Sequence, residues 1–152
     1  MPLQLPLLLQ EARVGPGGPA HVVADLMLRC IIEQPDSLTV WGTGAARREL
    51  LYVDDAAKGV LSCVNGQPGA FYNIGTGQDV SIYKLATSIS AATGLNAPIV
   101  FDSTRPDGQL LKVMEVSKAA EELNWQATTP LASGLTQTAK WYLKMLRSGE
   151  VI

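Results

Sequence analysis

The sequence predicts an α/β fold, and three observations support this prediction. Short runs of β-branched and aromatic residues alternate along the chain with longer segments in which apolar residues recur every three or four positions. Glycine- and proline-rich turns separate the two kinds of segment. Residues that favour helix starts stand in front of several helical segments. Strands that alternate with helices in this way are typical of an α/β domain.

The length and charge of the chain restrict its function. It has 152 residues, 12 basic and 14 acidic, so its formal charge is −2 and it is long enough for one domain with a substantial core. Binding to a nucleic acid or an anionic membrane needs a positive face, which this balance disfavours. The apolar start, Met1–Gln10, has no basic residue before it and contains Pro6, so a signal peptide is not expected. We therefore expect a cytoplasmic protein that binds neither nucleic acid nor a membrane.

The first elements follow from local composition. Residues 1–19 are rich in leucine, proline and glycine and have no clear period, so we expect an irregular N-terminal segment followed by an α/β domain over residues 20–152. A helix is predicted from Pro19, as a first-turn proline, to Gln34, where Pro35 stops it. Residues 37–41 then predict a strand, because they are β-branched and aromatic.

The middle of the chain predicts a strand, a helix and a second strand. Glu49–Tyr52 is the first strand, and Asp54 or Asp55 caps the helix that follows, which ends at residues 65–69. We interpret the two adjacent aspartates as helix-cap charges and not as a metal or acid–base pair. The sequence AFYNI at residues 70–74 predicts the second strand, which a Gly-Thr-Gly turn closes.

The last elements have clearer signals. Ser81 caps a helix that ends at Gly94. A strand at residues 98–101, a polar loop at 102–109 and a short helix at 117–124 follow. Thr129-Pro130 opens the last helix, which Gly149 ends. Its buried face is expected to consist of Leu131, Leu135, Tyr142 and Leu146.

Several common catalytic and cofactor-binding motifs do not occur in the chain. Both Gly-Thr-Gly turns lack the third glycine of a dinucleotide-binding turn, and no tyrosine is followed by a lysine four residues later. One histidine and two separated cysteines, Cys30 and Cys63, make neither a zinc site nor a disulfide framework. We expect both cysteines to be buried, reduced thiols, and we expect the chain to bind no metal and, on its own, no cofactor.

Three groups of residues are able to carry chemistry, and each has an ordinary structural alternative. His21, the only histidine, is either a general acid or a polar residue at a helix start. Trp41 offers a flat face for a base and Arg48 a fork for a phosphate; alternatively, the tryptophan fills the core and the arginine is solvated. Asp107, in the loop Arg105–Gly108, either meets sugar hydroxyls or belongs to an ordinary turn.

The order of several motifs resembles that of a known family. The motifs are HVVADLMLRC at residues 21–30, TVWGTGAARRELLYVDDAAKGV at 39–60, YNIGTG at 72–77, FDSTRPDGQ at 101–109 and NWQATTPLASGLTQTAKWYL at 124–143. Over most of its length the chain resembles the C-terminal, substrate-domain portion of extended short-chain dehydrogenase/reductases of the NAD-dependent epimerase/dehydratase family. Within that family it is most similar to the GDP-L-fucose synthases.

The resemblance implies roles for five residues. His21 corresponds to a proton donor beside the nicotinamide, and Arg29 to a residue of the same helix that contacts the nucleotide sugar. Trp41 corresponds to the residue beside the base and ribose, and Arg48 to the arginine that holds the diphosphate. Asp107 corresponds to an acidic loop residue that contacts the substrate. The cofactor of the family is NADP.

The chain also departs from the family pattern. It lacks the N-terminal Rossmann half, with its glycine-rich turn and its Tyr-x-x-x-Lys pair, and Leu110-Leu111-Lys112 stand where relatives usually have Pro-Arg-Lys. The resemblance therefore implies a truncated domain that binds a GDP- or UDP-linked sugar without catalysis on its own. Two alternatives remain: half of a split epimerase/reductase that needs a Rossmann partner chain, or a non-catalytic oligomeric interaction module.

The resemblance also predicts self-association. In the family, the elements that correspond to residues 49–74 pack on the Rossmann half. Without that half, their apolar faces and strand edges favour contact with another chain. We therefore expect a homo-oligomer, in which the apolar residues Leu3–Leu9 cover part of the exposed surface.

Overall fold

The computed structural model describes residues 21–148 and has the predicted α/β architecture. Its helices are α1 (Val22–Leu28), the π-helix η1 (Arg29–Glu33), α2 (Val53–Ser62), the 3₁₀ helix η2 (Cys63–Asn65), α3 (Ile82–Thr93), α4 (Ser117–Leu123) and α5 (Leu131–Ser148). Its strands are β1 (Leu38–Trp41), β2 (Arg47–Glu49), β3 (Asp79–Ser81), β4 (Ile99–Asp102) and β5 (Leu111–Lys112). The predictions for residues 1–19, including a helix start at Pro19 and a cover formed by Leu3–Leu9, and for Gly149 lie outside the described residues.

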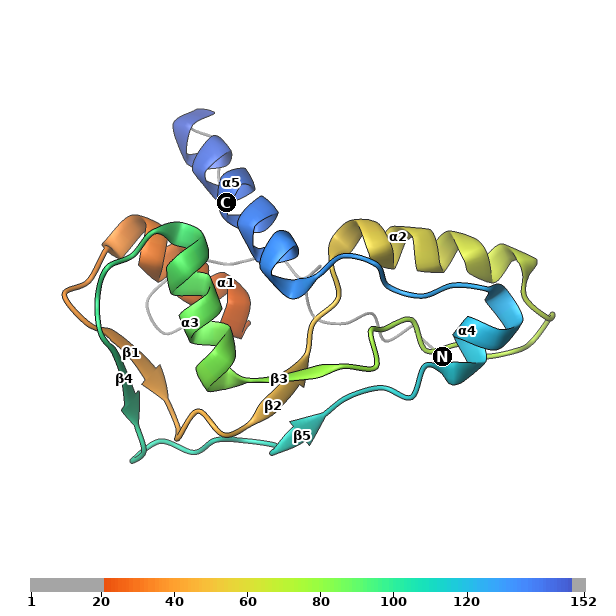
Figure 1. Cartoon of the computed structure of the whole chain (residues 1–152), viewed down its shortest axis with the longest axis horizontal. Helices are drawn as coiled ribbons and strands as arrows, with labels where there is room; N and C mark the ends of the chain where they lie inside the picture. The colour runs from red at the N-terminus through yellow and green to blue at the C-terminus, as the bar shows by residue number, and fades with distance from the viewer. Residues whose placement is uncertain (1–20, 149–152) are drawn as a thin grey trace.

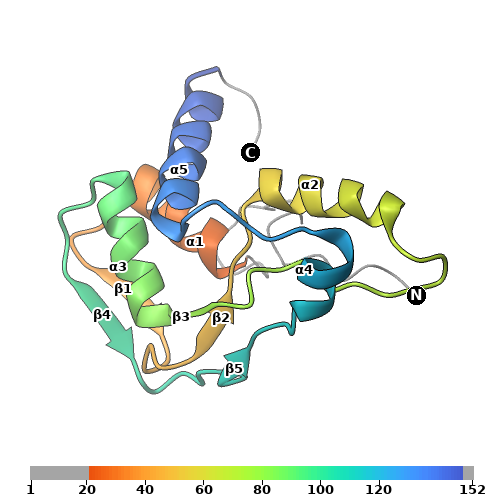
Figure 2. The ribbon, with the colours of Figure 1, turned by 45° about the vertical axis from the view of Figure 1, so that its right-hand side comes forward.

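The strands form two small sheets. Strands β1 and β4 run parallel, with Leu38 opposite Ile99 and Trp41 opposite Asp102. In the other sheet β2 lies in the middle, antiparallel to β3 and parallel to β5. Figures 1 and 2 both show the chain that leaves β4 following the chain that leaves β1 toward the second sheet. The loops after β1 and β4 are therefore neighbours.

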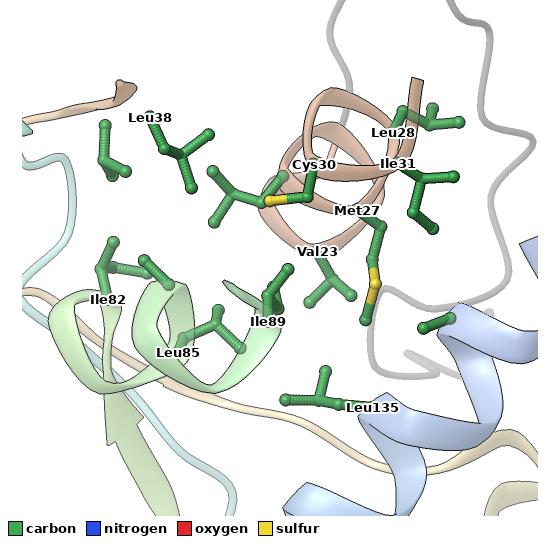
Figure 3. Packing of buried hydrophobic residues seen from close by; sticks show 14 of the residues in the cluster. Val23, Met27, Leu28, Cys30, Ile31, Leu38, Ile82, Leu85, Ile89 and Leu135 are labelled. Carbon is green, nitrogen blue, oxygen red and sulfur yellow. The ribbon is translucent and has the colours of Figure 1, made fainter. Parts of the chain in front are cut away.

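The larger hydrophobic core packs α1, η1, α3 and α5 against β1. Figure 3 shows that Met27 of α1, Cys30 of η1, Leu85 and Ile89 of α3, and Leu135 of α5 gather between these helices. Full burial of one such side chain contributes roughly 1.5–3 kcal/mol, so we expect this layer to supply most of the stability. The termini predicted for α3 are confirmed: its N-cap hydroxyl accepts the N–H of the third residue of the helix, and the glycine after it has a φ of 75°.

A second, smaller core lies beside α2 and α4. Its buried residues are Leu51, Ala56, Ile74, Ala119 and Trp125. Gly59 of α2 approaches two of them so closely that a Cβ would lie 2.4 Å from Ile74 Cγ2 and 2.9 Å from the Trp125 ring. Among the described residues, the two cores share none. In Figure 1, α2 and α4 lie to the right of α1 and α3.

The prediction that Asp54 or Asp55 caps the second helix is wrong. The N-cap of α2 is Tyr52, and Asp54 and Asp55 lie in the first turn. The side chain of Asp55 is buried, and it accepts hydrogen bonds from the backbone N–H groups of Thr128 at 3.0 Å and Thr129 at 2.7 Å. Asp55 is therefore a link between α2 and the segment that leads into α5.

The two strands predicted around this helix also differ. The strand expected at residues 49–52 lies at Arg47–Glu49, because these are the residues that pair with β3 and β5. The strand expected at residues 70–74 does not form. Burial still alternates along it, since Ile74 is buried, Tyr72 is half-buried and Phe71 is 78% exposed. Within residues 21–148 no strand pairs with this segment, and a strand needs a partner for its backbone hydrogen bonds.

Two predictions about burial are wrong in part. Leu146 is 39% exposed, because it lies on the last turns of α5, which extend beyond the core in Figure 1. Cys30 is buried, but Cys63 is only half-buried at the end of α2. Both are free thiols, and burial raises the pKa of each. The remaining α5 prediction is confirmed for Leu135 and Tyr142.

Candidate functional site

The candidate site lies where β1 and β4 end, and Trp41 is its aromatic residue. Side chains alternate along β1, so Leu38 and Val40 point into the core while Thr39 and Trp41 point outward. Trp41 is 66% exposed. The alternative in which this tryptophan fills the core is therefore wrong, and most of its surface is open to solvent.

Arg105 covers part of the Trp41 ring. Its guanidinium carbon lies 5.0 Å from the ring centroid, a cation–π distance, and its Nε lies 3.8 Å from Asp102 Oδ2. The other oxygen of Asp102 accepts hydrogen bonds from the hydroxyl and the backbone N–H of Thr104. These bonds lower the pKa of Asp102 below its usual range, so its carboxylate is ionised near neutral pH and attracts the guanidinium.

Asp107 joins the loop after β4 to the loop after β1. Its Oδ1 accepts the backbone N–H of Thr43 at 2.8 Å, and its Oδ2 accepts the Thr43 hydroxyl at 2.7 Å. These two bonds, the hydroxyl first, lower the pKa of Asp107. Gly42, at a φ of 84°, leaves room for the carboxylate, since a Cβ there would lie 2.4 Å from Asp107 Oδ1. The carboxylate predicted to meet a sugar is thus already bound to the protein itself.

Arg48 is the central cation of the site. Its Nη1 donates to the carbonyl oxygens of Arg47 and Gln109, so the side chain lies along the loop that leads into β5. Lys112 stands opposite Arg48 in the parallel pairing of β2 and β5. No ion pair joins Arg48 or Lys112 to a carboxylate of residues 21–148, whereas Arg47 is paired with Asp79. Two uncompensated cations side by side are able to bind a doubly charged anion.

The other two predicted site residues lie on the first helix, away from the ends of β1 and β4. His21 is the half-buried N-cap of α1, and its carbonyl accepts the N–H of Asp25 at 2.9 Å. Arg29 on η1 pairs with Asp25 at 3.4 Å and with Glu33 at 3.8 Å. The charge of Arg29 is therefore balanced within its own helical segment. Within residues 21–148, no hydrogen bond or ion pair joins Arg29 to Trp41, Arg48 or Asp107.

Sequence reasoning missed Glu49 as an organising residue. Its Oε1 accepts the N–H groups of Thr76 and Gly77, and its Oε2 accepts that of Met114 at 2.6 Å. One carboxylate on β2 thus holds both the turn before β3 and the segment after β5. The sequence signal for this role was the position of Glu49, an acidic residue between two arginines and two leucines. Thr43 and Lys112 had no comparable signal, because their importance depends on what faces them.

Neither a metal site nor a membrane helix is found in the part of the chain that the structure describes. Residues 21–148 contain no group of three or more His, Cys, Asp or Glu side chains placed to hold an ion. None of the helices in the same range combines the length and the apolar character needed to cross a bilayer.

Comparison with known sequences places the motifs in a family. Residues 11–75 match the sequence model of the NAD dependent epimerase/dehydratase family. GDP-L-fucose synthase 1 of Arabidopsis thaliana is 38% identical to the chain over 129 residues, which are 82% of this chain and 40% of that protein. The resemblance predicted from the motifs is confirmed at this level.

Comparison with solved structures agrees with the fold. The chain is similar to the GDP-L-fucose synthetase from Naegleria fowleri bound to NADP, with a TM-score of 0.77 and 27% identity over 85% of this chain and 42% of that one. It is also similar to UDP-glucose 4-epimerase from Thermotoga maritima with UDP-glucose, with a TM-score of 0.76 and 27% identity over 90% of this chain and 44% of that one. The chain thus spans about two fifths of the length of the relatives it matches.

Proposed function

Because this chain belongs, as part of an extended short-chain dehydrogenase/reductase, to the NAD dependent epimerase/dehydratase family, we propose that it binds a nucleotide sugar and does not catalyse a reaction on its own. One observation carries the proposal. Trp41 is exposed where β1 ends, and the loops that follow β1 and β4 lead from there to β2 and β5, where Arg48 and Lys112 lie opposite each other. An aromatic face and two cations are the complementary chemistry for a base and a diphosphate.

Each part of the proposed ligand has a partner with suitable chemistry. The base stacks on the open surface of Trp41. The diphosphate lies along β2 and β5. Within residues 21–148, only Nη1 of Arg48 donates to backbone carbonyls, so the other N–H groups of its guanidinium are available to the diphosphate. Lys112 adds a second positive charge. We favour GDP over UDP as the nucleotide, because curated relatives that are 32–38% identical to the chain are described as GDP-L-fucose synthases.

The proposed lack of catalysis rests on the residues of this chain. A relative is described as bound to NADP, but the chain has no tyrosine with a lysine four residues later and no three-glycine dinucleotide turn. His21, as the proton donor that the family resemblance implies, acts only when a cofactor and a proton relay are supplied by another part or another chain. Arg29, paired with Asp25 and Glu33, contributes to sugar binding only after its ion pairs rearrange.

A second candidate function is docking with another chain, either a Rossmann partner or a second copy. The observation that favours it is the group of exposed apolar side chains around α2. Leu61 is 69% exposed, Val64 82% and Phe71 78%. Phe71 belongs to the segment 70–74, whose burial alternates but which has no strand beside it in residues 21–148. A surface of this kind favours association.

Calorimetric titration of the purified chain with GDP tests the main proposal, with UDP and NADPH as comparison ligands. We expect saturable binding of GDP, weaker binding of UDP and none of NADPH. Arg48→Gln and Lys112→Gln should each weaken GDP binding roughly tenfold, the loss of one charge-assisted contact. Lys140→Gln, at an exposed lysine of α5, is the matched control and should bind like the unaltered chain. A folded chain that binds neither nucleotide would refute the proposal.

A further inference from the structure

One residue pair joins the two loops of the candidate site through a side-chain carboxylate, in addition to the backbone bond from Gly42 N–H to the Asp102 carbonyl at 2.9 Å. Asp107 uses both carboxylate oxygens on Thr43, one for the backbone N–H and one for the hydroxyl. The same hydroxyl accepts the N–H of Ala45 at 3.2 Å, so its own hydrogen is directed to Asp107. Two bonds from one carboxylate to one residue restrain both position and orientation. We name this pair the clasp.

The clasp lies two residues from Arg105, and the loop is anchored again on the other side of that arginine. The backbone N–H of Arg105 donates to the carbonyl of Asp102 at 3.1 Å, and the side chain of Asp102 accepts two bonds from Thr104. Pro106, between Arg105 and Asp107, has a restricted φ angle. The backbone of Arg105 is therefore fixed from both sides, and its guanidinium lies over Trp41.

Both oxygens of the Asp107 carboxylate are already used within the protein. Its Oδ1 lies against the backbone of Gly42, where a Cβ would come within 2.4 Å. A sugar hydroxyl would have to share a carboxylate that already has a protein donor on each oxygen. Trp41 and Arg105, by contrast, present open surface, since Trp41 is 66% exposed and the Arg105 side chain is 56% exposed.

We infer that Asp107 is a positioning residue: together with Thr43 it holds Arg105 against one face of Trp41, so that the nucleotide base stacks on the surface of Trp41 that Arg105 leaves open. This inference rests on the proposed function, and it replaces the expected contact of Asp107 with the substrate by an action through Arg105. It predicts that Thr43, which no motif singled out, matters for binding as much as Asp107 does.

A double-mutant cycle separates positioning from direct contact. If the clasp is the functional unit, Thr43→Val and Asp107→Asn each weaken GDP binding by a similar factor, roughly three- to tenfold, and the double variant is no weaker than either single one. Thr43→Ser keeps the hydroxyl and should restore binding. Ser103→Ala, at an exposed position of the same loop, is the control and should have no effect. Loss in Asp107→Asn with unchanged binding in Thr43→Val would overturn the inference, because it would make Asp107 the ligand contact.

A second readout tests the clasp without a nucleotide. The chain has three tryptophans, so 5-fluorotryptophan gives three ¹⁹F signals, and Trp41→Phe identifies that of Trp41. Thr43→Val, Asp107→Asn and Arg105→Gln should all shift this signal in the same direction, while the signals of Trp125 and Trp141 stay in place. If the chain binds no GDP but these shifts occur, the proposed function fails and the clasp stands. If GDP binds and the Trp41 signal ignores the clasp variants, the clasp fails alone.

Discussion

Replacing Asp55 should destabilise the chain more than replacing Asp54, the other carboxylate of α2. The side chain is 2% exposed, and its oxygens accept the N–H of Thr128, the N–H of Thr129 and, at 3.3 Å, the Thr128 hydroxyl. A hydrogen bond to a charged group contributes about 1.5–3 kcal/mol, and replacing Asp55 removes the acceptor of both the Thr128 and the Thr129 N–H groups. We expect Asp55→Ala to lower the free energy of unfolding by about 3–4 kcal/mol and Asp55→Asn, which keeps one acceptor, by about 2 kcal/mol.

The neighbouring aspartate provides a matched control. Asp54 lies in the same first turn of α2, but it is exposed. Asp54→Asn removes the same charge from the same helix end, and the exposed contribution of such a charge to the helix dipole is about 0.3–1 kcal/mol. Urea unfolding followed by circular dichroism measures both variants. Equal losses in Asp54→Asn and Asp55→Asn would refute the reasoning, because the effect would then come from helix charge and not from the link to residues 128–129.

The dependence on pH has a definite sign. Burial alone would raise the pKa of Asp55, but the hydrogen bonds from Thr129 and Thr128 outweigh it, so the pKa in the folded chain lies below the ordinary value of 3.8. The stabilisation by this carboxylate is therefore complete above that value and is lost as the pH falls through the lower pKa of the folded state. The stability difference between Asp55→Asn and Asp54→Asn should be constant near neutral pH and shrink in strong acid. A difference that grows on acidification would contradict the assignment.

Four further substitutions test other parts of the structure. Glu49→Ala should lower the free energy of unfolding by about 2–4 kcal/mol in urea unfolding, because three backbone N–H groups lose their acceptor. Gly94→Ala should cost about 1–2 kcal/mol through its φ of 75° alone, since a Cβ there has no neighbour within 4 Å; an unchanged midpoint would contradict this. Leu61→Ser and Phe71→Ser should reduce self-association in sedimentation and binding of an apolar dye; variants that sediment and bind dye like the unaltered chain would show that this surface is not an interface.

The parts of the fold that depend on local pattern were predictable from the sequence. Helix α3 is an example, since its capping serine, its apolar period and its terminal glycine all lie within fourteen consecutive residues. The segment at residues 70–74 is the opposite case. It has the composition and the burial alternation of a strand, but a strand exists only where another one pairs with it, and that partner is not encoded in the segment. Strand β5 was missed for a related reason, because two residues have no period.

The candidate site was predictable as a set of residue types and not as a set of contacts. Trp41 and Arg48 were identified first by their residue types and then by their order in the family motifs, and the register of β2 with β5 adds Lys112. Asp107 was identified correctly as a loop carboxylate, but its partner Thr43 lies 64 residues away. A sequence motif does not show which distant residue will donate hydrogen bonds to a given carboxylate. Such pairings depend on the loops that the sheets bring together.

The proposed binding and the catalysis that the family resemblance implies can be tested separately for a physical reason. The aromatic and cationic parts of the site are held by contacts that all lie within residues 21–148: the β1–β4 and β2–β5 pairings, the Thr43–Asp107 clasp and the Glu49 carboxylate. These contacts are therefore ones that the described part of the chain itself supplies to the site. The proton transfer that the family resemblance assigns to His21 requires a cofactor and a relay that these contacts do not supply. A nucleotide titration of the isolated chain is therefore a fair test of binding, and restored turnover on addition of a Rossmann partner is a separate test of catalysis.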